Sequence, residues 1–138
     1  MKRNLLLGTF IILLFISLTA CGGSGANSEA KSLMNAMAST CNKLADQIEK
    51  ASKPEELVKA FNDYDKDMTK HDKKLKELHK KYPNFGKNNK VSADFKAAEK
   101  KFSEAQKKIE KNLKLDTAKK LMVDPKVQQA AKVLTGGF

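Results

Sequence analysis

Residues 57–82 read LVKAFNDYDKDMTKHDKKLKELHKKY, and this stretch decides the fold. Its apolar and aromatic side chains, with one histidine among them, recur at alternating steps of four and three residues: Leu57, Phe61, Tyr64, Met68, His71, Leu75, Leu78 and Tyr82. Such steps place the set along one side of an α-helix, and a sustained 3.5-residue period is typical of a coiled-coil seam. The pattern predicts a helix from about Lys53 to Tyr82 that ends there because Pro83 disfavours helical geometry in the residue before it.

The flanking segments carry the same helical period, and no segment alternates in the manner of a β-strand. A first helix is predicted from Ser28 on the positions Ala30, Leu33, Met34, Met37, Cys41, Leu44, Ile48 and Ala51. A third helix, capped by Ser92 with Asp94 in its first turn, is predicted on Phe95, Ala98, Phe102, Ala105, Ile109 and Leu113. Between the first two, Ser52 and Glu55 have the spacing of a capping box, and Pro54 suits a first helical turn.

The connections between these helices suggest how they are arranged. The very short link near Ala51 makes the first two helices antiparallel neighbours, and the third helix can return beside both. Asp124-Pro125 begins a short last helix that ends at Gly136-Gly137. The expected fold is therefore all-α: an elongated three-helix bundle, antiparallel and with a coiled-coil-like seam, followed by a short C-terminal helix.

The start of the chain has a different character. Lys2 and Arg3 precede an almost unbroken apolar run of 14 residues, from Leu5 to Leu18. At about 1.5 Å per residue such a helix is too short to cross a hydrocarbon core of about 30 Å. The run predicts a signal peptide, and the small residues Thr19 and Ala20 precede its cleavage point.

The segment Leu18-Thr19-Ala20-Cys21 resembles the lipobox of bacterial lipoproteins, in which Leu, a small or β-branched residue, Ala or Gly, and Cys follow one another. The resemblance implies cleavage between Ala20 and Cys21, lipidation of Cys21 through a diacylglycerol thioether, and a membrane-anchored location in the bacterial cell envelope. An ordinary secretory signal and an uncleaved anchor are the alternatives. The chain is thereby divided into a signal peptide (1–20), a flexible tether rich in Gly and Ser (21–27) and a helical bundle domain (28–138).

The resemblance also bears on which membrane holds the protein. The residue after Cys21 is Gly22 and not the aspartate that resembles an inner-membrane retention signal. The outer membrane is therefore favoured if the source is Gram-negative, whereas a Gram-positive source would place the protein on its plasma membrane.

Charge and cysteine content restrict the partners. Removing Lys2 and Arg3 with the leader lowers the basic residues from 27 to 25 against 16 acidic ones, which leaves a net charge of +9 carried by lysine alone. Lysine lacks the planar fork with which arginine reads phosphates, so we expect no nucleic-acid partner, while weak attraction to anionic lipids or glycans stays open. With Cys21 lipidated, Cys41 has no intramolecular disulfide partner, and it is predicted to be a buried thiol or an intermolecular disulfide.

Few residues suggest chemistry. His71, the polar member of the seam, is either a ligand or proton-transfer group or, as we favour, a partly buried side chain satisfied by a neighbour. His79 and Cys41 stand at no metal-ligand spacing from it, and Asp63, Asp65 and Asp67 lie two apart on a helix and do not converge. We predict no catalytic residue, no metal and no cofactor, and the sequence identifies no ligand-binding residue.

These observations lead to one functional hypothesis and its alternatives. The protein is predicted to be a lipid-anchored helical envelope protein, not an enzyme, with a structural or protein-interaction role. The alternatives are a periplasmic or surface binding module for an apolar or anionic ligand, and an inhibitor or immunity-type partner of an exported enzyme. An interior cavity favours a binding module, whereas an exposed apolar stripe favours an interaction protein.

Overall fold

The computed structural model describes residues 24–83 and 92–135, and all regular structure within them is helical. The predicted signal peptide, Cys21 and the last three residues lie outside these ranges. None of the described helices combines the length and the hydropathy that crossing a membrane requires. The helices are α2 (Ser24–Lys50), α3 (Pro54–Lys81), α4 (Ala93–Leu113), α5 (Asp116–Leu121), α6 (Pro125–Ala130) and the 3₁₀ helix η1 (Ala131–Thr135).

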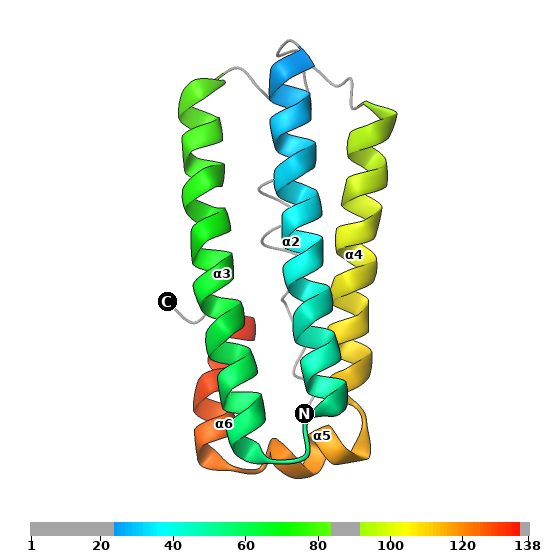
Figure 1. Ribbon diagram of the computed structural model, residues 1–138, viewed down its shortest axis with the longest axis vertical. Coiled ribbons are helices and arrows are strands. Elements are labelled where there is room, and N and C mark those ends of the chain that lie inside the picture. The colour runs from blue at the N-terminus through cyan, green and yellow to red at the C-terminus, as the bar shows by residue number, and fades with distance from the viewer. Residues whose placement is uncertain (1–23, 84–91, 136–138) are drawn as a thin grey trace.

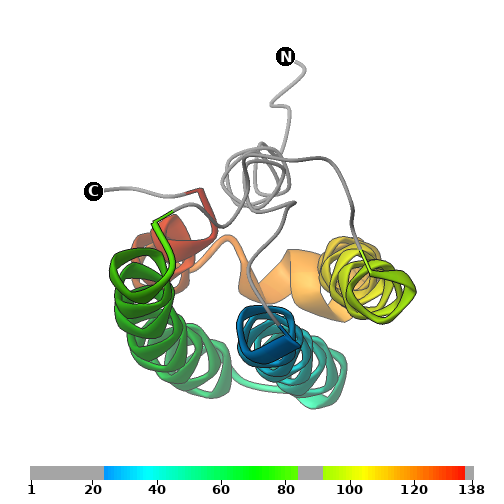
Figure 2. The same cartoon turned by 90° about the horizontal axis from the view of Figure 1, so that it is seen from above.

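The three long helices pack side by side with α2 in the middle (Figures 1 and 2). Lys81 of α3 pairs with Glu29 near the start of α2, so α3 runs antiparallel to α2. Lys31 pairs with Asp94 at the start of α4, whereas α2 and α4 meet again near their ends, so these two helices run parallel. The sequence predicted that the third helix returns beside both others, but α4 packs on α2 and forms no extensive contact with α3.

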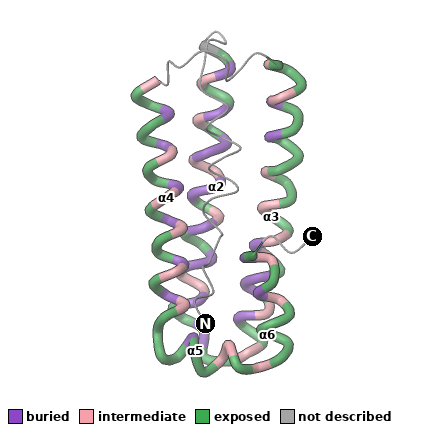
Figure 3. The backbone as a smooth tube through the Cα atoms, turned by 180° about the vertical axis from the view of Figure 1, so that it is seen from behind, coloured by how far each residue is buried: buried purple, intermediate pink, exposed green. Residues whose placement is uncertain are grey.

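The predicted apolar positions form the core. All eight positions of the first helix are buried, and so are Phe95, Ala98, Phe102, Ala105 and Ile109 of α4. In α3 the seam residues Leu57, Phe61, Tyr64, Leu75 and Leu78 are buried, whereas Met68, His71 and Tyr82 are only half-buried (Figure 3). The helical period therefore identified the inward side of each long helix correctly.

The helix starts confirm some predicted caps and correct one. The Ser92 hydroxyl accepts a hydrogen bond from the Phe95 amide at 3.2 Å. The predicted capping box used the wrong acid: Glu56, and not Glu55, accepts from the backbone amides of Ser52 and Lys53, at 2.7 and 3.2 Å. The helix starts one residue later than a Ser52 cap requires, so the reaching carboxylate is one residue later as well.

Two boundaries also differ from the prediction. Helix α2 begins at Ser24 and not at Ser28, so the part of the predicted tether that the structure describes, residues 24–27, is helical, and Ala26 is fully buried. Burial of the Ala26 side chain favours this extra turn, which a composition rich in Gly and Ser does not suggest. At the opposite end the sequence pattern did not predict α5, a short helix that joins α4 to α6. The predicted helix start at Asp124 is confirmed, because the Asp124 carboxylate accepts a hydrogen bond from the Lys126 amide at 2.8 Å.

One buried polar residue was missed entirely. Asn112, which is 5 % exposed, donates from Nδ2 to the carbonyl oxygen of Ala45 at 2.8 Å. A buried amide without a partner would be costly, so this hydrogen bond fixes the end of α4 against α2. Asn112 lies next to the predicted apolar position Leu113, which is only half-buried.

Candidate functional site

The candidate site is the end of the domain closest to Cys21, which we call the anchor end. Helix α2 begins at Ser24, three residues after Cys21, and three residues span about 11 Å at most. The end of α3 and the start of α4 lie at this same end (Figure 1). A lipid on Cys21, which the sequence predicts, would therefore be held close to this end of the three long helices.

Polar contacts fasten the helix ends together there. The Glu29 carboxylate of α2 accepts hydrogen bonds from Lys81 Nζ at 2.5 Å and from the Tyr82 hydroxyl at 3.1 Å. The hydrogen bond from Lys81 is the main reason why the pKa of Glu29 is lowered, and the same bond raises the pKa of Lys81. On the other side, Lys31 Nζ contacts Asp94 at 2.8 Å. These exposed pairs add little stability each, but they fix the register of the helices.

The second half of α3 carries a row of lysines that reaches the anchor end. We call its outward-facing members the basic face: Lys70, Lys73, Lys74, Lys80 and Lys81. Their spacing of three, four and seven residues puts them on one side of the helix, and all five are exposed. Lys76, in the same half of α3, pairs instead with Asp72 at 2.7 Å.

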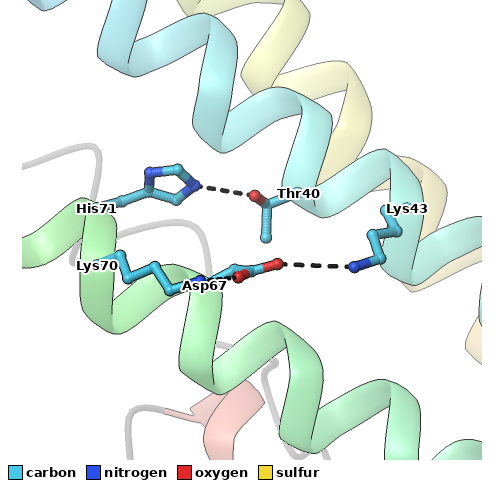
Figure 4. Close-up of polar contacts among 5 residues, drawn as sticks. All are labelled: Thr40, Lys43, Asp67, Lys70 and His71. Atoms are coloured by element: carbon cyan, nitrogen blue, oxygen red, sulfur yellow. Dashed lines mark hydrogen bonds and ion pairs between the residues drawn. The ribbon is translucent and has the colours of Figure 1, made fainter.

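His71 lies in the interface between α2 and α3, where its Nε2 and the Thr40 hydroxyl form a hydrogen bond of 2.9 Å (Figure 4). Its Nδ1 is buried and has no hydrogen-bond partner. Beside it, Asp67 accepts from Lys70 at 2.9 Å and pairs with Lys43 of α2 at 3.7 Å (Figure 4). The contact with Thr40 is what the favoured interpretation of His71, a side chain satisfied by a neighbour, requires.

The surroundings of His71 favour its neutral form. Burial is the main reason why the pKa of His71 is lowered, and the positive charge of Lys74 acts in the same direction. Asp67 opposes this effect, and Lys70 adds to it. A neutral ring has one nitrogen without a proton, which can accept the hydrogen bond that the Thr40 hydroxyl donates.

We expect the His71→Leu variant to be as stable as the wild type near neutral pH, or more stable, because it removes an unpartnered buried nitrogen. Since the histidine binds its proton more tightly in the unfolded chain, wild-type stability should fall as the pH drops below 6.5. This part of the decline should be missing in the variant. Urea unfolding of both proteins across this range measures it, and a parallel decline in both would contradict the assignment.

The other candidate ligands do not converge. Among the described residues no group of three or more His, Cys, Asp or Glu side chains could hold a metal ion. Asp67 and Asp72 are each paired with lysines, and Cys41 lies in the core. We expect zinc to leave the melting temperature of the wild type and of His71→Leu unchanged, because a ligand that binds only the folded state must raise it.

Cys41 is a free cysteine and fully buried. Burial raises the pKa of its thiol to about 11, although a hydrogen bond with Tyr64 acts in the opposite direction. Burial likewise raises the pKa of Tyr64. Of the two predicted roles of Cys41, the buried thiol agrees with this position, whereas an intermolecular disulfide would require the residue to reach the surface.

Alkylation of Cys41 in the folded protein is expected to be slow. Only the thiolate reacts, and a rise of the pKa from 9.0 to about 11 lowers its fraction about 100-fold, before steric protection is counted. Reaction with a maleimide at mildly basic pH, followed by peptide mass spectrometry, should modify Cys41 only after unfolding. Rapid modification of the folded protein, or a dimer that disappears on reduction, would contradict the buried assignment.

Two shallow hollows lie on the described surface, both open to solvent. One of about 320 Å³ separates the start of α3 from that of α6, with Val58, Asn62 and Lys126 in its lining. The other, about 600 Å³, lies between α2 and α4 and is lined by Ala38, Ala105 and surrounding polar and charged side chains. Neither has the enclosed apolar lining of a typical small-molecule site.

His71, His79 and Cys41 thus form no group that could hold a metal ion, and the basic face lies toward the anchor end. The sequence did not reveal the pairing of Glu29 with Lys81, and only the antiparallel direction of the first two helices pointed to such a contact. Comparison with protein-family models, curated proteins and solved structures found no match for this chain.

Proposed function

We propose that the protein is a bacterial lipoprotein held in the cell envelope by lipid on Cys21, with a helical domain that has a structural or protein-interaction role. The observation that carries the proposal is the segment Leu18-Thr19-Ala20-Cys21 after a basic start and a 14-residue apolar run. Each buried CH₂ of an acyl chain contributes about 0.8 kcal/mol, and two or three chains anchor stably where one does not. Membrane attachment then needs no spanning helix in the domain.

The proposal includes the shape of the domain. We infer an elongated bundle in which α2 and α3 form an antiparallel pair with a coiled-coil-like seam. The burial of Leu57, Phe61 and Leu75 supports this inference, as does the contact of Tyr64 with Cys41 across the pair. In such a bundle the anchor would lie at one end and α5 and α6 at the opposite end.

Mass spectrometry of the mature protein tests the anchor directly. Protein extracted from its native envelope should begin at Cys21, and its N-terminal peptide should carry the added mass of a diacylglycerol, with or without a further acyl chain. A peptide that begins elsewhere, or an unmodified Cys21, would refute the proposal and favour an ordinary secretory signal.

The interaction role needs a separate test, because the anchor says nothing about partners. Val123 is 72 % exposed and lies at the far end of the domain, where a protein partner is accessible to an anchored protein. A photo-cross-linker at Val123 in intact cells should give one defined cross-linked product, while one at exposed Lys100, near the middle of α4, serves as the control. Equal labelling at both positions would speak for a ligand-binding module and against a defined protein contact.

A further inference from the structure

We propose that the basic face of α3 binds the anionic phospholipid headgroups of the membrane that carries the lipid anchor. The proposal rests on the lipid anchor of the proposed function, and it adds a second, electrostatic contact. It would make the orientation of the domain on the membrane depend on lipid composition.

The charge of α3 is divided along its length. Its first half, residues 54–67, has five acidic residues and two lysines, whereas its second half, residues 68–81, has six lysines and two acidic residues. The net charge thus changes from −3 to +4 toward the anchor end. A helix whose lysines served only solubility would have no reason to collect them in the half nearest the membrane.

Three members of the basic face are available for a ligand. Among the described residues no carboxylate lies within ion-pair distance of Lys73, Lys74 or Lys80, whereas Lys70 and Lys81 are paired with Asp67 and Glu29. Helix α3 lies at one edge of the curved layer of long helices, so no other described helix covers this outward side (Figure 2). These lysines are exposed and none of them is in an ion pair, although the exposed Glu77 lies on the same side of the helix and lowers the net charge of the five-lysine face from +5 to +4.

The anchor brings this face within electrostatic range of the membrane. Lys81 contacts Glu29 of α2, and the start of α2 is no more than about 11 Å from Cys21. Along α3, Lys73 lies about 10 Å from Lys80. This is comparable with the Debye length of about 8 Å at physiological salt, so a modest tilt of the domain toward α3 puts all three unpaired lysines at the surface.

The chemistry of the face suits headgroups. Lysine is a hydrated point charge that is attracted to a diffuse anionic surface without a fixed geometry, and each lysine near such a surface contributes about 1 kcal/mol, which corresponds to about fivefold in population. A dissolved acidic glycan has the same charge, but it has no reason to meet the anchor end in particular. The position of the face therefore favours phospholipid.

Lysine acylation on vesicles tests the proposal. The full-length lipidated protein is reconstituted into phosphatidylcholine vesicles with or without phosphatidylglycerol and treated with a membrane-impermeant acylating reagent, and each lysine is quantified by mass spectrometry. Lys73, Lys74 and Lys80 should react about fivefold more slowly on the anionic vesicles, and high salt should remove the difference. The exposed lysines Lys59 and Lys126 near the far end should react alike on both.

Two variants sharpen the test. Lys70 belongs to the same face and should also be acylated more slowly on anionic vesicles. Replacing Lys73, Lys74 and Lys80 by glutamine should remove this difference at Lys70. The same replacement at Lys59, Lys120 and Lys126 should preserve it. Flotation with the vesicles reports the anchor separately: protein that does not float refutes the proposed function itself. Protein that floats but is acylated alike on both vesicles overturns the headgroup contact, and so does protection seen only with a dissolved acidic polysaccharide.

Discussion

Replacing Cys21 by alanine is expected to abolish both the incorporation of labelled palmitate and the attachment of the protein to the membrane. The thioether can form only on a cysteine sulfur, and without the acyl chains the domain has no described helix that could span the bilayer. The variant should collect as a precursor that keeps residues 1–20, or appear as soluble protein after export. Detergent phase separation and a palmitate label measure the two effects together.

The matched control is Cys41→Ala, which removes the only other cysteine of the chain. Cys41 is buried in the core, so this variant should keep the palmitate label and enter the detergent phase as the wild type does. Loss of the label in Cys41→Ala, or its retention in Cys21→Ala, would mean that the lipid is attached elsewhere. Wild-type protein that is wholly soluble after export would remove the basis of the proposed function.

The second large effect is expected in the core of the bundle. Phe102 of α4 and Phe61 of α3 are 1 % and 0 % exposed. Changing either to aspartate removes a buried ring, which costs about 3–5 kcal/mol, and places an unpaired charge in an apolar site, which costs several more. Since domains of this size are stable by about 5–15 kcal/mol, both variants should be unfolded by far-UV circular dichroism.

Exposed and half-buried positions in the same helices provide the controls. Lys107→Asp changes an exposed residue of α4 and should leave the helical signal and the melting temperature almost unchanged. The stability of Met68→Asp should lie between that of Phe102→Asp and that of Lys107→Asp, because Met68 belongs to the predicted seam but is only half-buried. If Phe102→Asp behaved like Lys107→Asp, the helix would not pack through the side that the structure assigns.

Local sequence determined which side of each helix is buried. Periodicity identified the buried positions from Ala30 to Ala51, from Leu57 to Leu78 and from Phe95 to Ile109. It could do so because the apolar side of a helix is buried regardless of which element packs against it. Caps at Ser92 and Asp124 were predictable for a similar reason, since each acts on amides only two or three residues away. The segment Leu18-Thr19-Ala20-Cys21, on which the proposed lipidation rests, is equally local, and it lies outside the described residues.

Only the tertiary structure decided which neighbour each stripe meets. Any apolar surface can cover a stripe with a period of three and four residues, so the period could not show that α4 packs on α2 and forms no extensive contact with α3. The hydrogen bonds of Thr40 with His71 and of Asn112 with Ala45 join residues 31 and 67 positions apart, and no local pattern pairs them. The same holds for Glu29 and Lys81, whose contact places the basic face beside the start of α2. The packing direction of the helices, and not their composition, brings those two side chains together.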